Sequence, residues 1–140
     1  MKKSTTKLIK ELSLCTEFRS FYDKNKDILI RDTLSQLLNR LVTEKGLKKS
    51  QVIRDSEMSE VYGYQIFSGL RTPERNKLLC LALAMRLTLD ETQTLLKSAG
   101  YTLLYVKRPV DSVVIYGICK HLTVADVNCL LYEYELETLG

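Results

Sequence analysis

Apolar residues recur every three or four positions along most of the chain, which is the spacing of one face of an α-helix. The clearest segment covers about residues 32–45, from Asp32 to Lys45, and is closed by Gly46. The apolar residues that share its face are Leu34, Leu37, Leu38, Leu41 and Val42. This pattern predicts a helix here, and its recurrence in later segments predicts an all-α protein.

Two shorter helices are predicted to follow. The first covers about residues 49–56. The second begins at Ser59, whose hydroxyl suits an N-cap, and ends at Gly69, where a helix adopts its left-handed stop. Only Glu57 and Met58 separate the two helices, so we expect a tight turn between them.

The next helix is expected to be the central one. Thr72 followed by Pro73 combines an N-cap with the residue favoured at the first helical position, so these two residues predict the start of this helix. Residues 78–85 are apolar on nearly every side, which is typical of a helix that is buried all round.

A fifth helix completes a unit that spans residues 31–100. Thr88 and Glu91 have the spacing of a capping box, in which each side chain bonds the other's backbone N–H. The helix that they start is expected to close at Gly100. Residues 31–100 therefore form a five-helix domain in this interpretation.

The remaining forty residues, 101–140, are predicted to form a two-helix extension packed on that domain. Residues 101–110 look extended, Asp111 is expected to cap one helix, and Thr123 is expected to cap the last one after a short turn. Asn128 falls on the inward face of the last helix, where its amide can satisfy backbone groups.

Charge and length bound the class of the protein. A chain of 140 residues with 45% hydrophobic and 27% charged residues is one globular domain with extensions. Residues 1–30 carry 7 basic and 4 acidic side chains, residues 31–100 carry 11 and 8, and residues 101–140 carry 3 and 5. A polyanion would therefore meet the first hundred residues. Residues 1–30 are expected to form an N-terminal helical extension that covers the core through Leu8, Ile9, Leu12, Phe18 and Phe21.

Nothing in the sequence favours catalysis, a cofactor or a metal. There is no glycine-rich phosphate loop, no histidine cluster and no pairing of carboxylates. Cys119, His121 and Cys129 have neither zinc-ligand spacing nor a fourth ligand. Cysteines without such partners are usually small buried hydrophobes, and His121 is expected at the surface. We therefore expect a protein that is not an enzyme.

The chain is expected to be cytoplasmic. Its longest apolar run, residues 78–85, is stopped by Arg86 and is much shorter than the roughly 18 residues of a membrane span. Lys10 and Glu11 interrupt the apolar stretch that a signal peptide would need.

The spacing of residues 31–100 resembles the lambda-repressor-like, Cro-type helix-turn-helix family of DNA-binding proteins, often labelled XRE. The residues that carry the resemblance are 47–69 and the basic loop 69–75. Residues 62–69 and 128–131 are also similar to bacterial members that are extended at both ends. The resemblance implies a five-helix helix-turn-helix unit with additional N-terminal and C-terminal helices.

Some positions depart from the family pattern, which has a small residue in the first helix, a glycine in the turn and a β-branched residue in the second helix. Here these positions hold Ile53, Glu57 and Gly63. Exchanging the large and small partners keeps their summed volume, so two closely crossing helices still fit. Glu57 tolerates a positive φ poorly, which indicates a turn that differs in detail. Lys48 and Lys49 stand where the family has a Ser or Thr cap and a Gln.

The resemblance also assigns residues to DNA contacts. A helix in the major groove presents its first turns to base edges, while flanking amides and cations hold phosphates. The residues expected to read bases are Ser59, Glu60, Val61, Tyr62, Tyr64 and Gln65. The residues expected to bind phosphates are Lys48, Lys49, Arg71, Arg75 and Lys77.

The residue chemistry supports these assignments with one reservation. Gln65 suits an adenine edge, Val61 a thymine methyl and Glu60 the N4 amine of cytosine. Glu60 is also repelled by phosphate, which is the main argument against DNA. The basic residues have an alternative role as solvated surface, and Tyr62 and Tyr64 have one as packing residues.

Two functions remain open at this point. One is sequence-specific binding of double-stranded DNA by a transcriptional regulator, as a homodimer because one short helix reads few bases. The alternative is a protein–protein interaction adaptor on the same scaffold. Its partner would meet the acidic C-terminal helix in residues 130–139, which carries Tyr132 and Tyr134.

Overall fold

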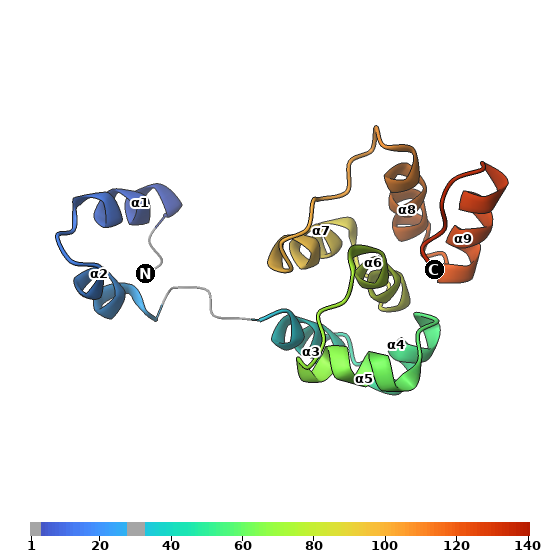
Figure 1. Ribbon diagram of the computed structural model, residues 1–140, viewed down its shortest axis with the longest axis horizontal. Helices are drawn as coiled ribbons and strands as arrows, with labels where there is room; N and C mark the ends of the chain where they lie inside the picture. Colours follow the sequence, from blue (N-terminus) through green and yellow to red (C-terminus); the bar gives the residue numbers. More distant parts are fainter. Residues whose placement is uncertain (1–3, 28–32) are drawn as a thin grey trace. The chain divides into compact units, whose positions relative to one another are not determined.

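The structure is a computed structural model that describes residues 4–27 and 33–140 (Figure 1). All regular secondary structure in those residues is α-helical, which confirms the prediction of an all-α chain. The chain divides into two compact units, Met1–Arg31 and Asp32–Gly140, and each is described by itself.

The first unit contains a helical hairpin of α1 (Thr5–Leu14) and α2 (Phe18–Asn25). Its interior holds the side chains of Phe21 and Asn25. The Asn25 amide donates to the Phe21 carbonyl oxygen at 3.0 Å and to Glu11 Oε2 at 3.1 Å, so it ties α2 to α1. Residues 1–30 were predicted to be helical, and both helices are present within the described part.

The second unit begins with α3 (Leu34–Glu44). Thr33 is its N-cap and makes a reciprocal capping box with Gln36. The first helical residue, Leu34, is two residues after the start predicted from sequence at Asp32, which lies outside the described residues. The apolar face of α3 is buried as the pattern predicted, and it consists of Leu37, Leu38, Leu41 and Val42.

The next two helices are α4 (Lys49–Asp55) and α5 (Glu60–Ser68). The Ser59 hydroxyl caps α5 by accepting the Tyr62 backbone N–H at 3.2 Å. Gly69 ends α5 in the left-handed region with φ 86°. The predicted pair of short helices and both of their signals are therefore confirmed.

The start of α6 (Arg75–Ala84) corrects the prediction made from Thr72 and Pro73. The N-cap is Glu74, and Pro73 lies before the helix as a buried loop residue. Its carbonyl oxygen accepts a hydrogen bond from the Tyr101 hydroxyl at 2.6 Å. This tertiary contact holds the proline in the loop, and it overrides the local preference for the first helical position.

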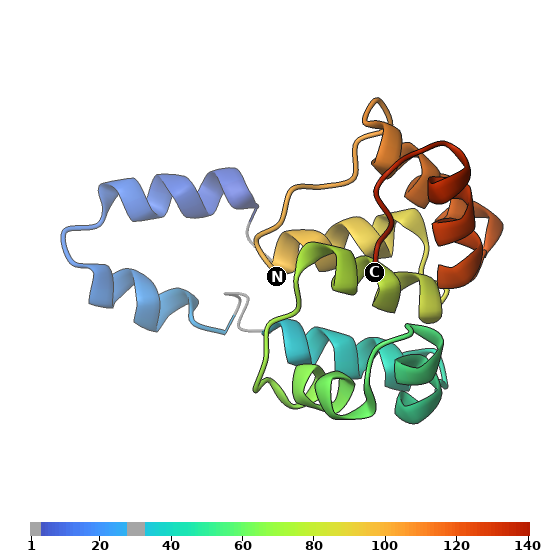
Figure 2. The ribbon, with the colours of Figure 1, turned by 45° about the vertical axis from the view of Figure 1, so that its right-hand side comes forward.

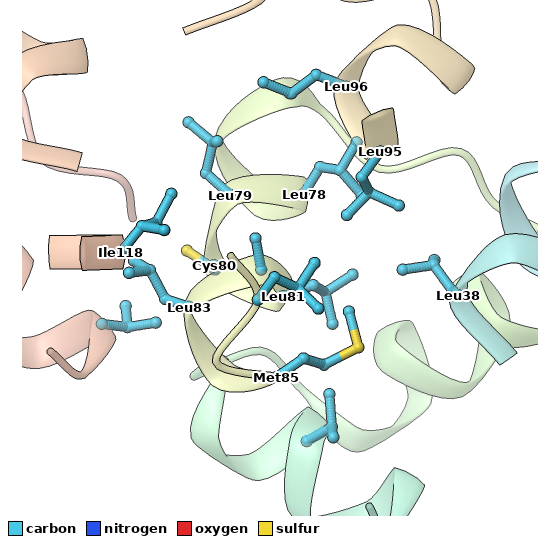
Figure 3. Close-up of a cluster of buried hydrophobic side chains, with 14 of the residues drawn as sticks. Leu38, Leu78, Leu79, Cys80, Leu81, Leu83, Met85, Leu95, Leu96 and Ile118 are labelled. Carbon is cyan, nitrogen blue, oxygen red and sulfur yellow. The ribbon is translucent and has the colours of Figure 1, made fainter. Parts of the chain in front are cut away.

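Helix α6 is the centre of the second unit, as its sequence predicted. It packs against α4, α7, α8 and α9 (Figure 2). Its side chains from Leu78 to Leu83 are all buried. Figure 3 shows how Leu38 of α3, Leu95 and Leu96 of α7 and Ile118 of α8 surround them. One continuous core therefore joins residues 33–100 to residues 101–140.

The last three helices are α7 (Leu89–Ser98), α8 (Pro109–Lys120) and α9 (Val124–Glu133). The predicted caps at Thr88 and Thr123 are confirmed, and each is a full capping box. The predicted cap at Asp111 is wrong. Arg108 is the N-cap of α8, Pro109 takes the first position, and Asp111 lies inside the first turn with 3% of its surface exposed.

The segment between α7 and α8 is also shorter than predicted. Residues 101–105 have no regular secondary structure, and a turn closed by the Arg108 N–H on the Tyr105 carbonyl leads into α8. Val110, which was expected to be extended, lies in the helix. Asn128 accepts the Leu139 backbone N–H at 2.8 Å, which confirms that its amide satisfies a backbone group.

The cysteines bear out only part of the prediction that they are buried. Cys80 is buried and Cys15 is half-buried, whereas Cys119 and Cys129 are exposed. Within the described residues no group of histidine, cysteine and acidic side chains could hold a metal ion. In the same residues, none of the helices has both the length and the apolar character that crossing a bilayer requires.

Candidate nucleic-acid interface

The candidate site is built on the close contact between α4 and α5. A Cβ atom added to Gly63 would lie 2.7 Å from Cγ1 of Ile53, and closer still to Cγ2 of the same side chain. No real Cβ fits at such distances, so only glycine lets α5 pack this tightly on α4. The large-into-small fit predicted for Ile53 and Gly63 is present.

The turn between α4 and α5 adopts the backbone conformation that a glycine would favour. Glu57 has φ 61°, and its backbone N–H donates to the Arg54 carbonyl oxygen at 3.0 Å. The expectation that Glu57 alters the turn is thus not met at this residue, which adopts the left-handed conformation despite its side chain. Ser56, just before it, is buried and its hydroxyl donates to the Ile53 carbonyl oxygen at 2.6 Å.

Most of the residues expected to read bases lie on the outer side of α5. Val61 exposes 69% and Tyr64 41% of its surface, and Ser59 and Glu60 are also exposed. Gln65 is half-buried. Tyr62 differs, because it is partly buried and packs against the hydrophobic core. Its role is therefore that of a packing residue, one of the two alternatives considered from sequence.

An open groove of about 570 Å³ runs along this outer side of α5. Lys49 enters it from the first turn of α4, and its Nζ atom lies 5.3 Å from the centroid of the Phe67 ring. A cation at this distance from an aromatic face is attracted to it, so Lys49 is held over α5. The groove is lined by Lys49, Glu60, Val61, Tyr64, Gln65, Phe67, Ser68 and Leu70.

The loop after α5 is fixed by backbone and side-chain bonds. The backbone N–H groups of Leu70 and Arg71 both donate to the Gln65 carbonyl oxygen, at 2.9 and 3.2 Å. Nε of Arg71 donates to Oε1 of Gln65 at 3.1 Å. Asn39 of α3 braces the same end of α5, because its amide donates to the Phe67 carbonyl oxygen at 2.8 Å. Arg71 and Gln65 are therefore positioned together.

The five basic residues expected to bind phosphates do not share one environment. Lys48, the N-cap of α4, and Arg71 are exposed, and Lys49 lies in the groove. Lys77 is half-buried on the first turns of α6. Three of the five, Lys48, Lys49 and Arg71, thus belong to the helices or loop that flank the outer side of α5.

Arg75 requires a correction, because its guanidinium is used inside the protein. Its two terminal nitrogens each lie 3.3 Å from a carboxylate oxygen of Asp111. Nε donates to the Thr102 carbonyl oxygen at 2.9 Å, and Nη2 lies 3.4 Å from that of Leu103. Arginine offers five N–H donors, and this clamp engages most of them, so the Arg75 guanidinium has a structural role within the protein.

Sequence reasoning missed some residues of this surface. Ser68, the last residue of α5, and Leu70, in the loop that follows, both line the groove. Ser50 and Arg54 of α4 line a smaller hollow of about 200 Å³ with Glu60. Their helical spacing of four residues places Ser50 and Arg54 on one side of α4, and that was the available signal. Arg54 adds a cation to the hollow that Glu60 also lines.

No family model, no curated protein and no solved structure matches this chain.

Proposed function

We propose that residues 33–140 bind double-stranded DNA in the manner of the lambda-repressor-like helix-turn-helix family, with α5 in the major groove. The observation that supports this most is the outer side of α5. Helix α5 is capped by Ser59 and packs closely on α4 at Gly63. Its outer side exposes polar and apolar side chains, and two cations flank it, Lys49 from α4 and Arg71 from the loop after α5.

In this proposal base contacts come from three exposed or half-exposed positions of α5. Val61 meets a thymine methyl, Gln65 an adenine edge, and Glu60 the N4 amine of cytosine. Oε1 of Gln65 already accepts from Arg71, and its second lone pair remains for the base. The Arg71 bond therefore orients Gln65 in advance, which lowers the entropy lost when the amide binds.

Phosphate contacts come from Lys48, Lys49 and Arg71. Lys48 is the N-cap of α4, Lys49 is its first residue, and Arg71 follows the end of α5. Arg54 lines the same hollow as Glu60, and in this proposal its positive charge offsets part of the repulsion between that carboxylate and the DNA backbone.

The salt dependence of binding tests the proposal. We expect the affinity for a duplex, measured by fluorescence anisotropy, to fall steeply with salt, because each neutralised phosphate releases counterions. Arg71→Ala should lower the slope of log K against log salt by about one unit. Lys107→Ala is the matched control, since Lys107 is an exposed cation in the segment before α8, and it should leave the slope unchanged.

The results of these measurements distinguish DNA binding through α5 from DNA binding elsewhere and from no DNA binding. Binding that ignores salt, or no binding at low salt, contradicts the proposal. Equal effects of Arg71→Ala and Lys107→Ala would place the DNA somewhere other than α5. Selection of bound sequences from a random duplex pool then identifies the site, and an enriched palindrome would support two symmetric half-sites.

Sequence reading is tested separately at Gln65. Gln65→Ala should relax the preference at one base position and leave nonspecific affinity nearly intact, because base contacts specify and phosphate contacts position. The measurement is a comparison of selected sequences for the two proteins. An unchanged preference would remove Gln65 from the base-reading residues.

A protein–protein adaptor is the second candidate, and exposed tyrosines favour it. Tyr132 exposes 80% and Tyr134 66% of its surface, and Tyr116 of α8 exposes 51%. Tyr116 and Tyr134 line a hollow of about 360 Å³ with Ser112, Val113 and Leu130. Tyrosine is enriched at protein interfaces, because its ring is apolar and its hydroxyl can hydrogen-bond. An adaptor without DNA affinity would show no salt-dependent duplex binding.

A further inference from the structure

The last two helices form a hollow on the second unit, where α8 and α9 lie side by side (Figure 1). Its volume is about 360 Å³, and we call it the tyrosine hollow. Val113 and Leu130 are half-buried there, whereas the rings of Tyr116 and Tyr134 are exposed. Ser112 completes the lining. The tyrosine hollow therefore combines apolar side chains with two accessible aromatic rings.

The backbone around the tyrosine hollow is fixed. Gly117 brings α8 and α9 close together. Where α9 ends, the Tyr134 backbone N–H donates to the Leu130 carbonyl oxygen at 3.1 Å. The chain then returns along α9, because the Leu139 backbone N–H donates to Oδ1 of Asn128 at 2.8 Å. A preformed site loses little conformational entropy when it binds, so the tyrosine hollow is suited to a partner.

The chain around Tyr134 is acidic. Residues 121–140 contain four acidic side chains and no lysine or arginine. One of the four, Asp126, is used inside the protein by the capping box of α9. Glu133 and Glu135, the two neighbours of Tyr134, are exposed, and neither forms an ion pair in the described part of the chain. This charge opposes a nucleic acid or an anionic membrane and favours a basic partner.

The tyrosine rings are a second attraction for a cation. Helix α8 has cations only at its ends, Arg108 before the helix and Lys120 at its last position. Nζ of Lys120 lies 6.0 Å from the centroid of the Tyr116 ring, at the limit of a cation–π contact. Within residues 33–140 no cation lies over the Tyr134 ring.

Arginine suits the Tyr134 ring better than lysine does. A guanidinium is planar and stacks on an aromatic face, and it pairs with a carboxylate at two points. Tyr134 offers the face, and Glu133 and Glu135 on either side of it in the chain offer the carboxylates. The ring and the two carboxylates together therefore favour an arginine of a partner.

We propose that the tyrosine hollow binds an arginine-bearing segment of another protein. A large apolar side chain of that segment lies against Val113 and Leu130. An arginine next to it stacks on Tyr134 and pairs with Glu133 or Glu135. This partner belongs to the adaptor role, the second candidate function, on which the proposal rests, and DNA binding by α5 is independent of it.

Selection from a random peptide library displayed on phage shows what the full-length protein binds. We expect the enriched peptides to carry an arginine next to a large apolar residue. The affinity of one such peptide is then measured by fluorescence anisotropy. Replacing its arginine by glutamine should weaken binding roughly tenfold, because the contacts of the guanidinium with the ring and the carboxylate are lost.

Variants of the protein locate the peptide. Tyr134→Ala should weaken binding roughly tenfold, because it removes the ring that holds the arginine. Combining Glu133→Gln with Glu135→Gln keeps the side-chain shapes, removes both charges and should weaken binding by a similar factor. Tyr132→Ala is the matched control, since this ring exposes 80% of its surface and does not line the hollow, and it should leave the affinity unchanged. Circular dichroism checks that each variant keeps its helices.

The proposal is overturned if no peptide is enriched or if the enriched peptides are acidic. Apolar peptides without arginine that need Tyr134 would keep the adaptor role and refute the basic partner. Binding that Tyr134→Ala leaves intact, or that Tyr132→Ala weakens equally, lies elsewhere on the protein. A dimer that light scattering detects and Tyr134→Ala dissociates would mean that a second copy occupies the hollow. Duplex binding is measured separately and should be the same in Tyr134→Ala, so failure here leaves the DNA proposal standing.

Discussion

Four non-glycine residues of the described chain have a positive φ, which is rare for any residue except glycine, and three of them lie at the ends of α4, α6 and α8. Glu57, Arg86 and His121 have φ values of 61°, 54° and 55°, and they follow α4, α6 and α8. For a residue with a Cβ atom, the left-handed conformation costs roughly 1–2 kcal/mol. All three line one hollow of about 410 Å³ on the second unit, which also contains Arg54 and the start of α9.

The strain at Glu57 leads to a stability prediction. Glu57→Gly should raise the free energy of unfolding by roughly 0.5–1 kcal/mol. Glycine adopts this φ without a steric clash, and that gain is larger than the stability lost because glycine gives the unfolded chain more conformational entropy. Urea denaturation measures the change. Glu60→Gly makes the same chemical change inside α5, where glycine is unfavourable, and it should lower the stability. A loss at both positions would contradict the argument.

The cysteines should differ in reactivity. Burial raises the pKa of the Cys80 thiol to about 11, against a smaller opposing effect of Lys77. The thiolate is the reactive form, so Cys80 should resist iodoacetamide at pH 8 in the folded protein. The exposed Cys119 and Cys129 should be alkylated under the same conditions. Mass spectrometry of the peptides checks this, with urea-unfolded protein as the control in which all four cysteines react.

At the scale of elements, two helix pairs approach through a glycine. Gly63 receives Ile53 between α5 and α4, and a Cβ on Gly117 of α8 would lie 2.5 Å from Cγ2 of Val127 on α9. Both opposing side chains are β-branched and therefore stiff at χ1, so they cannot move aside easily. The α8–α9 contact therefore has the same arrangement as the α4–α5 contact, a glycine facing a β-branched side chain. Gly117 could not be identified from sequence, because it lies outside the helix-turn-helix pattern of the family.

The α4–α5 fit can be measured as a coupling. Gly63→Ile should destabilise the protein by roughly 1–3 kcal/mol through overpacking, and Ile53→Ala should partly rescue it. The measurement is a double-mutant cycle of unfolding free energies. Val61→Ile adds a methylene to the exposed side of the same helix and should be nearly neutral. Additive losses in the double mutant would mean that the two side chains do not share one space.

The Arg75 clamp joins α6 to the start of α8. Arg75→Ala should destabilise the second unit by about 2–4 kcal/mol, because it leaves the buried Asp111 carboxylate without its cation. Asp111 would keep one bond from the Tyr105 backbone N–H. Thermal unfolding checks the prediction, and Arg108→Ala at an exposed position beside α8 is the control. An unchanged melting temperature would show that water replaces the guanidinium at no cost.

At the scale of the whole molecule, acid should weaken the fold through Glu91. The pKa of Glu91 is lowered, first by the hydrogen bond from the Thr88 backbone N–H and further by Lys45, whose Nζ lies 2.9 Å from Oε1. A carboxyl whose pKa is lowered by folding stabilises the protein above its unfolded pKa, and this contribution is lost as the pH falls.

The pH dependence can be assigned to this carboxyl. Urea denaturation between pH 7 and pH 3 should show stability falling below about pH 4.5, the ordinary pKa of a glutamate. Glu91→Gln keeps an oxygen for the capping box and should flatten that fall. If the variant falls as steeply as the wild type, another carboxyl is responsible.

The features that could be predicted from sequence are those that depend on neighbouring residues, and the features that were missed depend on residues far apart in the chain. Thr88 and Thr123 were identified because a capping box involves four neighbouring residues. The start of α6 and the role of Asp111 were wrong because Pro73 bonds Tyr101 and Asp111 bonds Arg75, which are 28 and 36 positions apart in sequence. No local pattern records such partners. For the same reason Arg75 resembled a free cation.

The same reasoning applies to the candidate site. The outer side of α5 was predictable because Ile53 and Gly63 fix which side faces inward. The position of Lys49 over Phe67 and the bond between Arg71 and Gln65 depend on how α4, α5 and the loop pack, so only the structure supplies them. The assignment of Tyr62 to packing likewise follows from burial.

The clamp between Arg75 and Asp111 decides where this protein can be shortened. A fragment that stops at Gly100 would lose the carboxylate that neutralises Arg75, along with the α8 and α9 side chains that cover one flank of α6. Leu83, which lies against Gly117 of α8, would then face water, and the shortened chain should aggregate on expression. Trimming from the other terminus, up to Asp32, keeps every contact among α3–α9 and should yield a well-behaved domain.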